Sequence, residues 1–96
     1  MTRNEIEHIR AQIDEIDRKL LQLLNERAQV VLNLAQHKVA EGLKLFDPER
    51  EQEIFKAMTA NNRGPLSAEA VTRLFERIID ESRSLERTEV YDKAKE

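Results

Sequence analysis

Two cations lie in or beside the apolar seam of the first forty residues, and they are the strongest candidates for chemistry in this sequence. Arg27 stands where a seam running through Leu20 and Leu23 requires an apolar side chain. A guanidinium keeps its charge, so a buried Arg27 needs a carboxylate or another anion beside it. Lys38 follows eleven residues later, about three helical turns on, and projects from nearly the same face. Taken separately, an internal ion pair or a snorkelling arginine is the favoured explanation of Arg27, and a helix-dipole lysine is that of Lys38; a site for a small anion is the alternative.

Arg10 is a third candidate cation, seventeen residues before Arg27. That spacing is roughly 25 Å along a helix axis, so Arg10 and Arg27 of one chain cannot hold the same small molecule. In an antiparallel pairing of two helices, Arg10 of one subunit would approach Arg27 of the other. The spacing permits such a shared site without requiring it.

Further polar candidates lie in the second half of the sequence. Ser82 interrupts an apolar stripe, and Glu86 follows four residues later on the same helix face. A buried serine that bonds back to its own helix is the usual explanation for such a position. Asp47 is suited to cap a helix, and Arg50 and Glu51 in the first turn of that helix resemble ordinary surface charges.

Several kinds of chemistry are excluded by what the sequence lacks. It contains no cysteine, so a disulfide, a thiolate metal site and a cysteine nucleophile are impossible. His8 and His37 are far apart, which gives neither a metal-ligand spacing nor a Ser-His-acid triad. A glycine-rich phosphate loop is missing as well. We therefore expect no metal site.

The elements that must position these residues are helices. Residues 4 to about 40 contain no Gly or Pro, and Asn4 is the expected N-cap. Apolar residues recur there at alternating steps of three and four: Ile6, Ile9, Ile13, Ile16, Leu20 and Leu23. Such a helix is roughly 55 Å long, whereas a globule of this size is only roughly 26 Å across. The helix should therefore pack along a partner, which predicts a dimer.

Two shorter helices follow, which gives an all-α chain of three helices. Gly42 ends the first helix, and Asp47 with Pro48 begins the second. The second helix stops in the breaker 61–65, and Ser67 caps the third. We expect one helical domain over 1–86. Residues 87–96 should form a polar tail that frays, or the start of a linker.

Composition narrows the class of protein further. The 96 residues suit one domain, and charged residues make up 36% of them. A net charge of −3 gives no general basic field, so nucleic acid is not an expected partner. No stretch approaches the roughly 20 apolar residues that span a membrane. The N-terminus lacks a signal-peptide pattern, and a cytoplasmic location fits the lack of cysteine.

The sequence resembles the all-helical class of chorismate mutases over about residues 9–86. Each matching piece is weak alone, but their order and spacing are quite specific. The pieces are 9–17, 20–21, 23–27, Lys38, 47–51, 74–79 and 82–85.

The resemblance implies an intertwined homodimer that rearranges chorismate to prephenate in phenylalanine and tyrosine biosynthesis. By matching position, Arg27 would bind one carboxylate and Arg10 of the other subunit the second. Lys38 would donate to the ether oxygen, where negative charge develops. This Claisen rearrangement is unimolecular and needs no nucleophile, metal or cofactor. The protein selects a compact conformer and stabilises charge separation in the transition state.

The same resemblance assigns the remaining candidates. Glu51 and the backbone at Asp47 would hold the ring hydroxyl, Arg50 would support them, and Ser82 would help to hold a carboxylate. Many family members have a glutamine that donates to the ether oxygen at the position of Glu86. We expect Glu86 to act protonated, with burial raising its pKa and Lys38 lowering it. The alternative is a surface glutamate in an ion pair.

Other functions remain open at this point. An isochorismate-pyruvate lyase resembles the mutases in fold and in its cationic site. A coiled-coil-like dimerisation module without catalysis would explain the long first helix, but not the joint placement of Arg10, Arg27, Lys38 and Glu51. A weakly active member that depends on a partner enzyme is a further alternative. The domain can also belong to a bifunctional protein.

Overall fold

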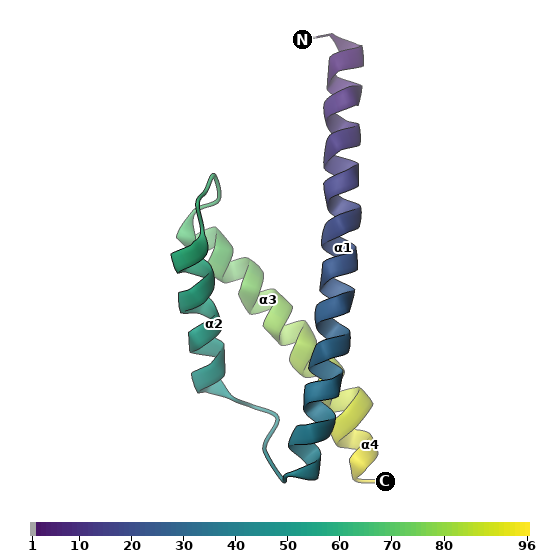
Figure 1. Ribbon diagram of the computed structural model, residues 1–96, viewed down its shortest axis with the longest axis vertical. Coiled ribbons are helices and arrows are strands. Elements are labelled where there is room, and N and C mark those ends of the chain that lie inside the picture. Colours follow the sequence, from purple (N-terminus) through teal and green to yellow (C-terminus); the bar gives the residue numbers. More distant parts are fainter. Residues whose placement is uncertain (1) are drawn as a thin grey trace. The chain divides into compact units, whose positions relative to one another are not determined.

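The computed structural model describes residues 2–96, and all regular structure within that range is helical (Figure 1). The predicted all-α chain with a long first helix and two shorter ones is confirmed. By internal contacts the chain divides into two units, Met1–Val30 and Val31–Glu96. The elements are α1 (Arg3–Ala40), α2 (Pro48–Asn61), α3 (Ala68–Glu86), a π-helical turn η1 (Arg87–Tyr91) and α4 (Asp92–Ala94).

The first unit holds the N-terminal turns of α1, which begins at Arg3, two residues earlier than an N-cap at Asn4 predicts. Asn4 is not the N-cap, and that prediction is wrong. The Thr2 hydroxyl accepts a hydrogen bond from the backbone N–H of Glu5 at 3.1 Å, and the Glu5 carboxylate accepts one from the backbone N–H of Thr2 at 3.3 Å. This reciprocal pair is a capping box, which satisfies two backbone donors at once and so outcompetes Asn4.

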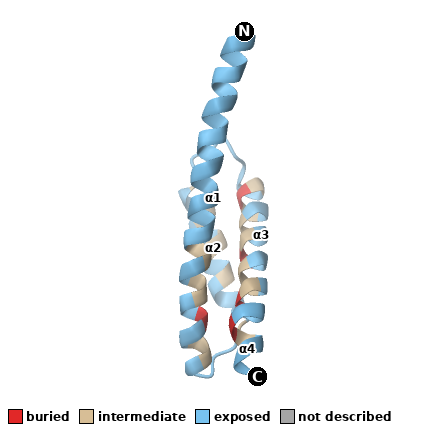
Figure 2. Ribbon diagram, turned by 90° about the vertical axis from the view of Figure 1, so that its right-hand side faces the viewer, coloured by how far each residue is buried: buried red, intermediate tan, exposed pale blue. Residues whose placement is uncertain are grey.

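The apolar seam of the first unit is exposed (Figure 2). Ile16 is 57% exposed and Leu23 is 60% exposed. Polar side chains bond along the same helix, as in the ion pair of Arg18 with Glu15 at 3.1 Å. Such surface pairs contribute little to stability, so a seam this apolar requires another surface to cover it.

In the second unit, α1 ends at a glycine turn, as predicted. Gly42 has a φ of +73°, a left-handed conformation that side chains other than glycine adopt at a cost. The backbone N–H of Gly42 donates to Val39 O at 3.1 Å, and that of Leu43 donates to Lys38 O at 2.8 Å. These two bonds form a Schellman-type cap, which satisfies the last carbonyls of the helix.

Helices α2 and α3 pack against each other as an antiparallel pair (Figure 1). Asp47 caps α2 through a bond from the backbone N–H of Arg50 at 3.1 Å, and Pro48 takes the first helical position. The Ser67 hydroxyl caps α3 by accepting from the backbone N–H of Ala70 at 3.0 Å. Both caps and the breaker between the helices are confirmed.

Residues after Glu86 do not fray, contrary to the prediction. They continue as η1 and α4, and Val90 is buried at 9% exposure. The Tyr91 hydroxyl donates to Leu43 O at 2.8 Å. Val90 and Tyr91 therefore hold this segment in place, although most of its other residues are polar. Whether the segment leads into a linker stays a prediction.

The buried side chains of the second unit come from three elements. The apolar ones are Ala35, Val71, Ile79 and Val90, and Glu86 is buried with them. Within the described part of the chain, no helix is long and apolar enough to cross a membrane.

Candidate active site

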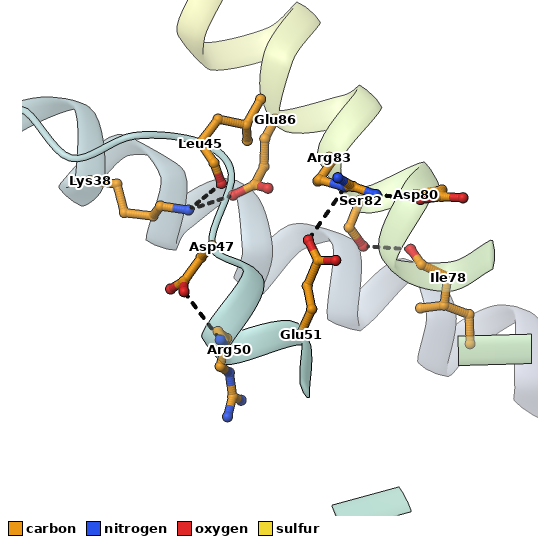
Figure 3. A network of polar contacts seen from close by, with 10 residues as sticks. All are labelled: Lys38, Leu45, Asp47, Arg50, Glu51, Ile78, Asp80, Ser82, Arg83 and Glu86. Carbon is orange, nitrogen blue, oxygen red and sulfur yellow. Dashed lines mark hydrogen bonds and ion pairs between the residues drawn. The ribbon is translucent and has the colours of Figure 1, made fainter. Parts of the chain in front are cut away.

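The polar centre of the second unit is an ion pair between Lys38 and Glu86 (Figure 3). Lys38 lies in the last turn of α1, and Glu86 is the last residue of α3. Lys38 Nζ is 3.7 Å from Glu86 Oε1 and donates to Leu45 O at 3.1 Å. The side chains are only 15% and 8% exposed. Salt screens a pair this buried far less than it screens a surface pair.

This geometry bears on the position of Glu86, and its role as a protonated donor stays a prediction. It forms an ion pair, as the second interpretation expects, but it is buried and not a surface residue. A buried carboxyl beside an ammonium brings two groups together that can each hold or donate a proton. Lys38 and Glu86 are therefore the pair best placed to stabilise charge on a ligand atom in this unit.

A second cluster surrounds Glu51 at the start of α2. Arg83 Nε lies 3.5 Å from Glu51 Oε2, and Arg83 also pairs with Asp80 on its own helix. The Arg83 guanidinium lies over the ring of Phe46, 5.4 Å from its centroid. Glu51 is 18% exposed at its side chain. Arg83 thus holds the Glu51 carboxylate toward α3 through a half-buried ion pair (Figure 3).

Arg83 is not among the predicted site residues, although the sequence contains a signal for it. Arg83 lies four residues after the buried Ile79, on the same helix face. A cation on an apolar face is the same kind of irregularity that singled out Arg27. Which carboxylate it would meet depended on the packing of α2 against α3.

The remaining candidates of the second unit are more loosely placed. The carboxylate of Asp47 caps α2. The Arg50 guanidinium is 64% exposed and pairs with Glu53 at 3.6 Å, so the structure does not bring it into the Lys38 or Glu51 clusters. The half-buried Ser82 hydroxyl donates to Ile78 O at 2.9 Å, as the usual explanation for a serine in a stripe predicts.

Arg10 and Arg27 lie in the first unit. Arg10 is 68% exposed and pairs with Glu7 at 3.1 Å. Arg27 is half-buried, unlike the exposed residues that precede it on α1. A site shared by the two arginines across subunits stays a prediction. Among residues 2–96, no group of three His, Asp or Glu side chains could hold a metal ion.

Comparison with known proteins identifies the family and the fold. The family model for chorismate mutase type II matches residues 9–87. The chain belongs to this family. The predictions of a chorismate mutase domain, an isomerase of aromatic amino acid biosynthesis, are thereby confirmed.

Relatives in the family differ in length. A bifunctional chorismate mutase/prephenate dehydratase of Aquifex aeolicus is 36% identical over 87 residues, which are 86% of this chain and 24% of the relative. The chain thus spans about a quarter of the length of that relative. A chorismate mutase of Methanocaldococcus jannaschii is 41% identical over 51 residues, covering 53% of this chain and 52% of that protein.

A solved structure matches nearly end to end. Chorismate mutase (form II) of Thermus thermophilus superimposes with a TM-score of 0.87 at 34% identity. The match covers 88% of this chain and 97% of that one. The family members therefore include a protein that consists almost entirely of the helical domain described here.

Proposed function

We propose that this domain, as a homodimer, catalyses the rearrangement of chorismate to prephenate. The observation that carries the proposal is the buried Lys38–Glu86 pair, held at 3.7 Å inside the segment that the family model matches. Desolvating two ionisable groups costs several kcal/mol per ion in proteins. Because a buried ion pair adds little net stability in return for this cost, the pair is a candidate for a functional role.

Lys38 has the central role in the proposed mechanism. As the carbon–oxygen bond of the ether breaks, negative charge grows on its oxygen, and the Lys38 ammonium stabilises that charge. An interaction that strengthens in the transition state accelerates the step, whereas one equally strong in the ground state does not. Arg27 and the partner subunit's Arg10 bind the two carboxylates and hold the compact, reactive conformer.

The carboxylate of Glu51 accepts from the ring hydroxyl in this proposal, with the backbone at Asp47 as its second contact. Its ion pair with Arg83 supports this role, because Arg83 fixes the direction of the carboxylate. Arg50 supports this network from the first turn of α2, and Ser82 assists with a substrate carboxylate. The exposed position of Arg50 means that substrate binding must draw its guanidinium inward.

Glu86 acts as a hydrogen-bond donor to the ether oxygen when it is protonated. Its burial, which disfavours the charged form, supports this part of the proposal, whereas the Lys38 ammonium opposes it. An ionised Glu86 would instead oppose the charge that grows on that oxygen. The reaction itself requires no metal or cofactor, because bond breaking and bond formation are concerted within one molecule.

A second copy of the chain is the proposed cover for the seam of α1. The exposed Ile13, Ile16, Leu20 and Leu23 support it, because burying apolar surface is the main driving force for association. Pairing two such helices would also deliver Arg10 to Arg27 of the other subunit. A cytoplasmic location completes the proposal.

The test is to incubate the purified protein with chorismate and identify the product. Prephenate from the parent protein, with a loss of at least a hundredfold in kcat/KM for Arg27→Ala, would support the proposal. Arg18→Ala is the matched control, because Arg18 is 70% exposed on the same helix and pairs only locally with Glu15. This control should keep the parental rate.

Other products would move the assignment. Salicylate and pyruvate formed from isochorismate, with chorismate untouched, would establish the lyase. No turnover of either substrate by a protein that sediments as a dimer would favour a dimerisation module. A monomer would contradict the shared site.

A further inference from the structure

The backbone of Leu43 forms a hydrogen bond through its N–H and another through its carbonyl, and the N–H bond is to Lys38. Its N–H donates to Lys38 O at 2.8 Å, and its carbonyl accepts from the Tyr91 hydroxyl at 2.8 Å. Two residues later, Leu45 O accepts from Lys38 Nζ at 3.1 Å. Leu43 therefore contacts the backbone carbonyl of Lys38, and Leu45 contacts the side-chain ammonium of Lys38. Tyr91 bonds to the start of this segment, at Leu43.

The π-helical turn η1 explains how Tyr91 reaches this segment. The backbone N–H of Asp92 donates to Arg87 O, five residues back, in place of the four-residue step of an α-helix. In such a turn, the residue five positions on returns to the same face, and Tyr91 is five positions after Glu86. A π-turn of this kind is uncommon and is often found at functional sites.

Two features describe the surroundings of the Tyr91 side chain. Burial raises the pKa of Tyr91, and the nearby carboxylate of Glu86 raises it further. Val90, the preceding residue, is buried, which fixes the turn against the rest of the unit. Tyr91 therefore remains a neutral hydroxyl donor at physiological pH, and its bond to Leu43 O lies two residues from the carbonyl that accepts from Lys38.

We propose that Tyr91 is a positioning residue, whose hydroxyl holds Leu43 and, through the segment to Leu45, keeps the Lys38 ammonium beside Glu86. The inference rests on the proposed function for its catalytic consequence. The contact joins residues 48 positions apart, so local helix formation cannot replace it. Tyr91 does not touch substrate in this proposal.

The variant that tests this is Tyr91→Phe, which removes the hydroxyl and keeps the ring. The matched control is Lys93→Gln, which breaks the exposed ion pair with Glu89 in the same segment and leaves Leu43 untouched. The first measurement is amide hydrogen exchange at Leu43, whose N–H bonds to Lys38 O. We expect exchange about threefold to tenfold faster in Tyr91→Phe, from the loss of one hydrogen bond, and unchanged exchange in Lys93→Gln.

The second measurement is steady-state kinetics with chorismate. We expect kcat to fall roughly threefold to tenfold in Tyr91→Phe while KM stays within twofold, because Lys38 acts in the transition state. Adding Tyr91→Phe to Lys38→Gln should cause no further loss. If Tyr91→Phe only reduced the amount of folded protein, it would lower kcat by the same factor in the parent and in the Lys38→Gln variant.

Each measurement tests a different part of the proposal. Unchanged exchange at Leu43 in Tyr91→Phe would overturn the anchoring role, whatever the activity. Faster exchange with unchanged kcat, or equal losses with and without Lys38, would overturn the positioning of Lys38. A parent protein that does not turn over chorismate would refute the proposed function, and with it the catalytic consequence, while the exchange result would still decide whether Tyr91 anchors the segment.

Discussion

Lys38 Nζ lies 3.7 Å from the Oε1 atom of Glu86, and the two residues come from the last turn of α1 and the end of α3. Their side chains are 15% and 8% exposed, which makes this pair more buried than the pair of Arg83 with Glu51, at 32% and 18%. A family position that often carries a neutral amide is thus filled by an acid next to an ammonium. The protonation state of this acid should set the working pH range.

Glu86→Gln should flatten the pH profile of the enzyme. In the parent, kcat/KM on chorismate should decline as pH rises through the pKa of Glu86, because the carboxylate opposes the negative charge on the ether oxygen. Glutamine donates at every pH and removes the decline. Glu81→Gln, an exposed change on the same helix, should keep the parental profile. A profile for Glu86→Gln that overlays the parent's would contradict the donor role.

Arg83→Met should weaken substrate binding through Glu51. The change keeps most of the side-chain length but removes the ion pair at 3.5 Å, so the Glu51 carboxylate loses its fixed direction. We expect KM for chorismate to rise roughly threefold to tenfold, in line with the loss of one partly exposed charged hydrogen bond. Arg77→Met breaks an exposed pair on the same helix and should leave KM unchanged. Equal effects of the two variants would exclude a specific role of Arg83.

Asp47→Ala and Ser67→Ala should separate stability from activity. Each removes a side-chain N-cap and should lower the free energy of unfolding by about 1 kcal/mol, measured by urea denaturation. Asp47 also ends the connection that carries Leu45, so its loss should lower kcat as well. Ser67 caps α3 at the opposite end from Glu86. A parallel loss of activity in both variants would show that the caps act through stability alone.

The titration of Tyr91 can be followed without a label, because the chain has one tyrosine and no tryptophan. Burial and then Glu86 raise the pKa of this side chain, so its near-ultraviolet titration should have a midpoint above the usual value of about 10. A raised pKa in the folded state gives a contribution to stability that is complete below the unfolded pKa. That contribution is lost as pH rises through the folded pKa, above about pH 10. Glu86→Gln should lower the midpoint; a midpoint that does not move would place Glu86 too far away to matter.

Local signals in the sequence were sufficient for most of the fold. Asp47 with Pro48, Ser67 and Gly42 mark helix ends through short-range bonds, and each acts as predicted. Thr2 carries an equally local signal, a threonine three residues before a glutamate, and it was overlooked in favour of Asn4. These features need no knowledge of tertiary packing.

The composition of the site was less accessible from sequence. Lys38 stood out in the sequence as a cation beside the apolar seam, and resemblance to the family supplied Glu51 and placed Glu86 near Lys38. The partner of Glu51 could not be predicted. Arg83 meets Glu51 only because α2 packs against α3. Tyr91 meets Leu43 only because a π-turn rotates it to that side, and the segment after Glu86 has too few apolar residues to reveal the added residue as a shift in spacing.

Both members of the Lys38–Glu86 pair stand at helix ends, where backbone bonds open most readily. The turn at Gly42 and the π-turn after Glu86 are what keep these ends closed. Substitutions in either turn can therefore alter the rate without touching a substrate-binding side chain. Within a lineage, selection acting on these connecting residues has a way to adjust turnover gradually while the arginines proposed to bind the substrate stay the same.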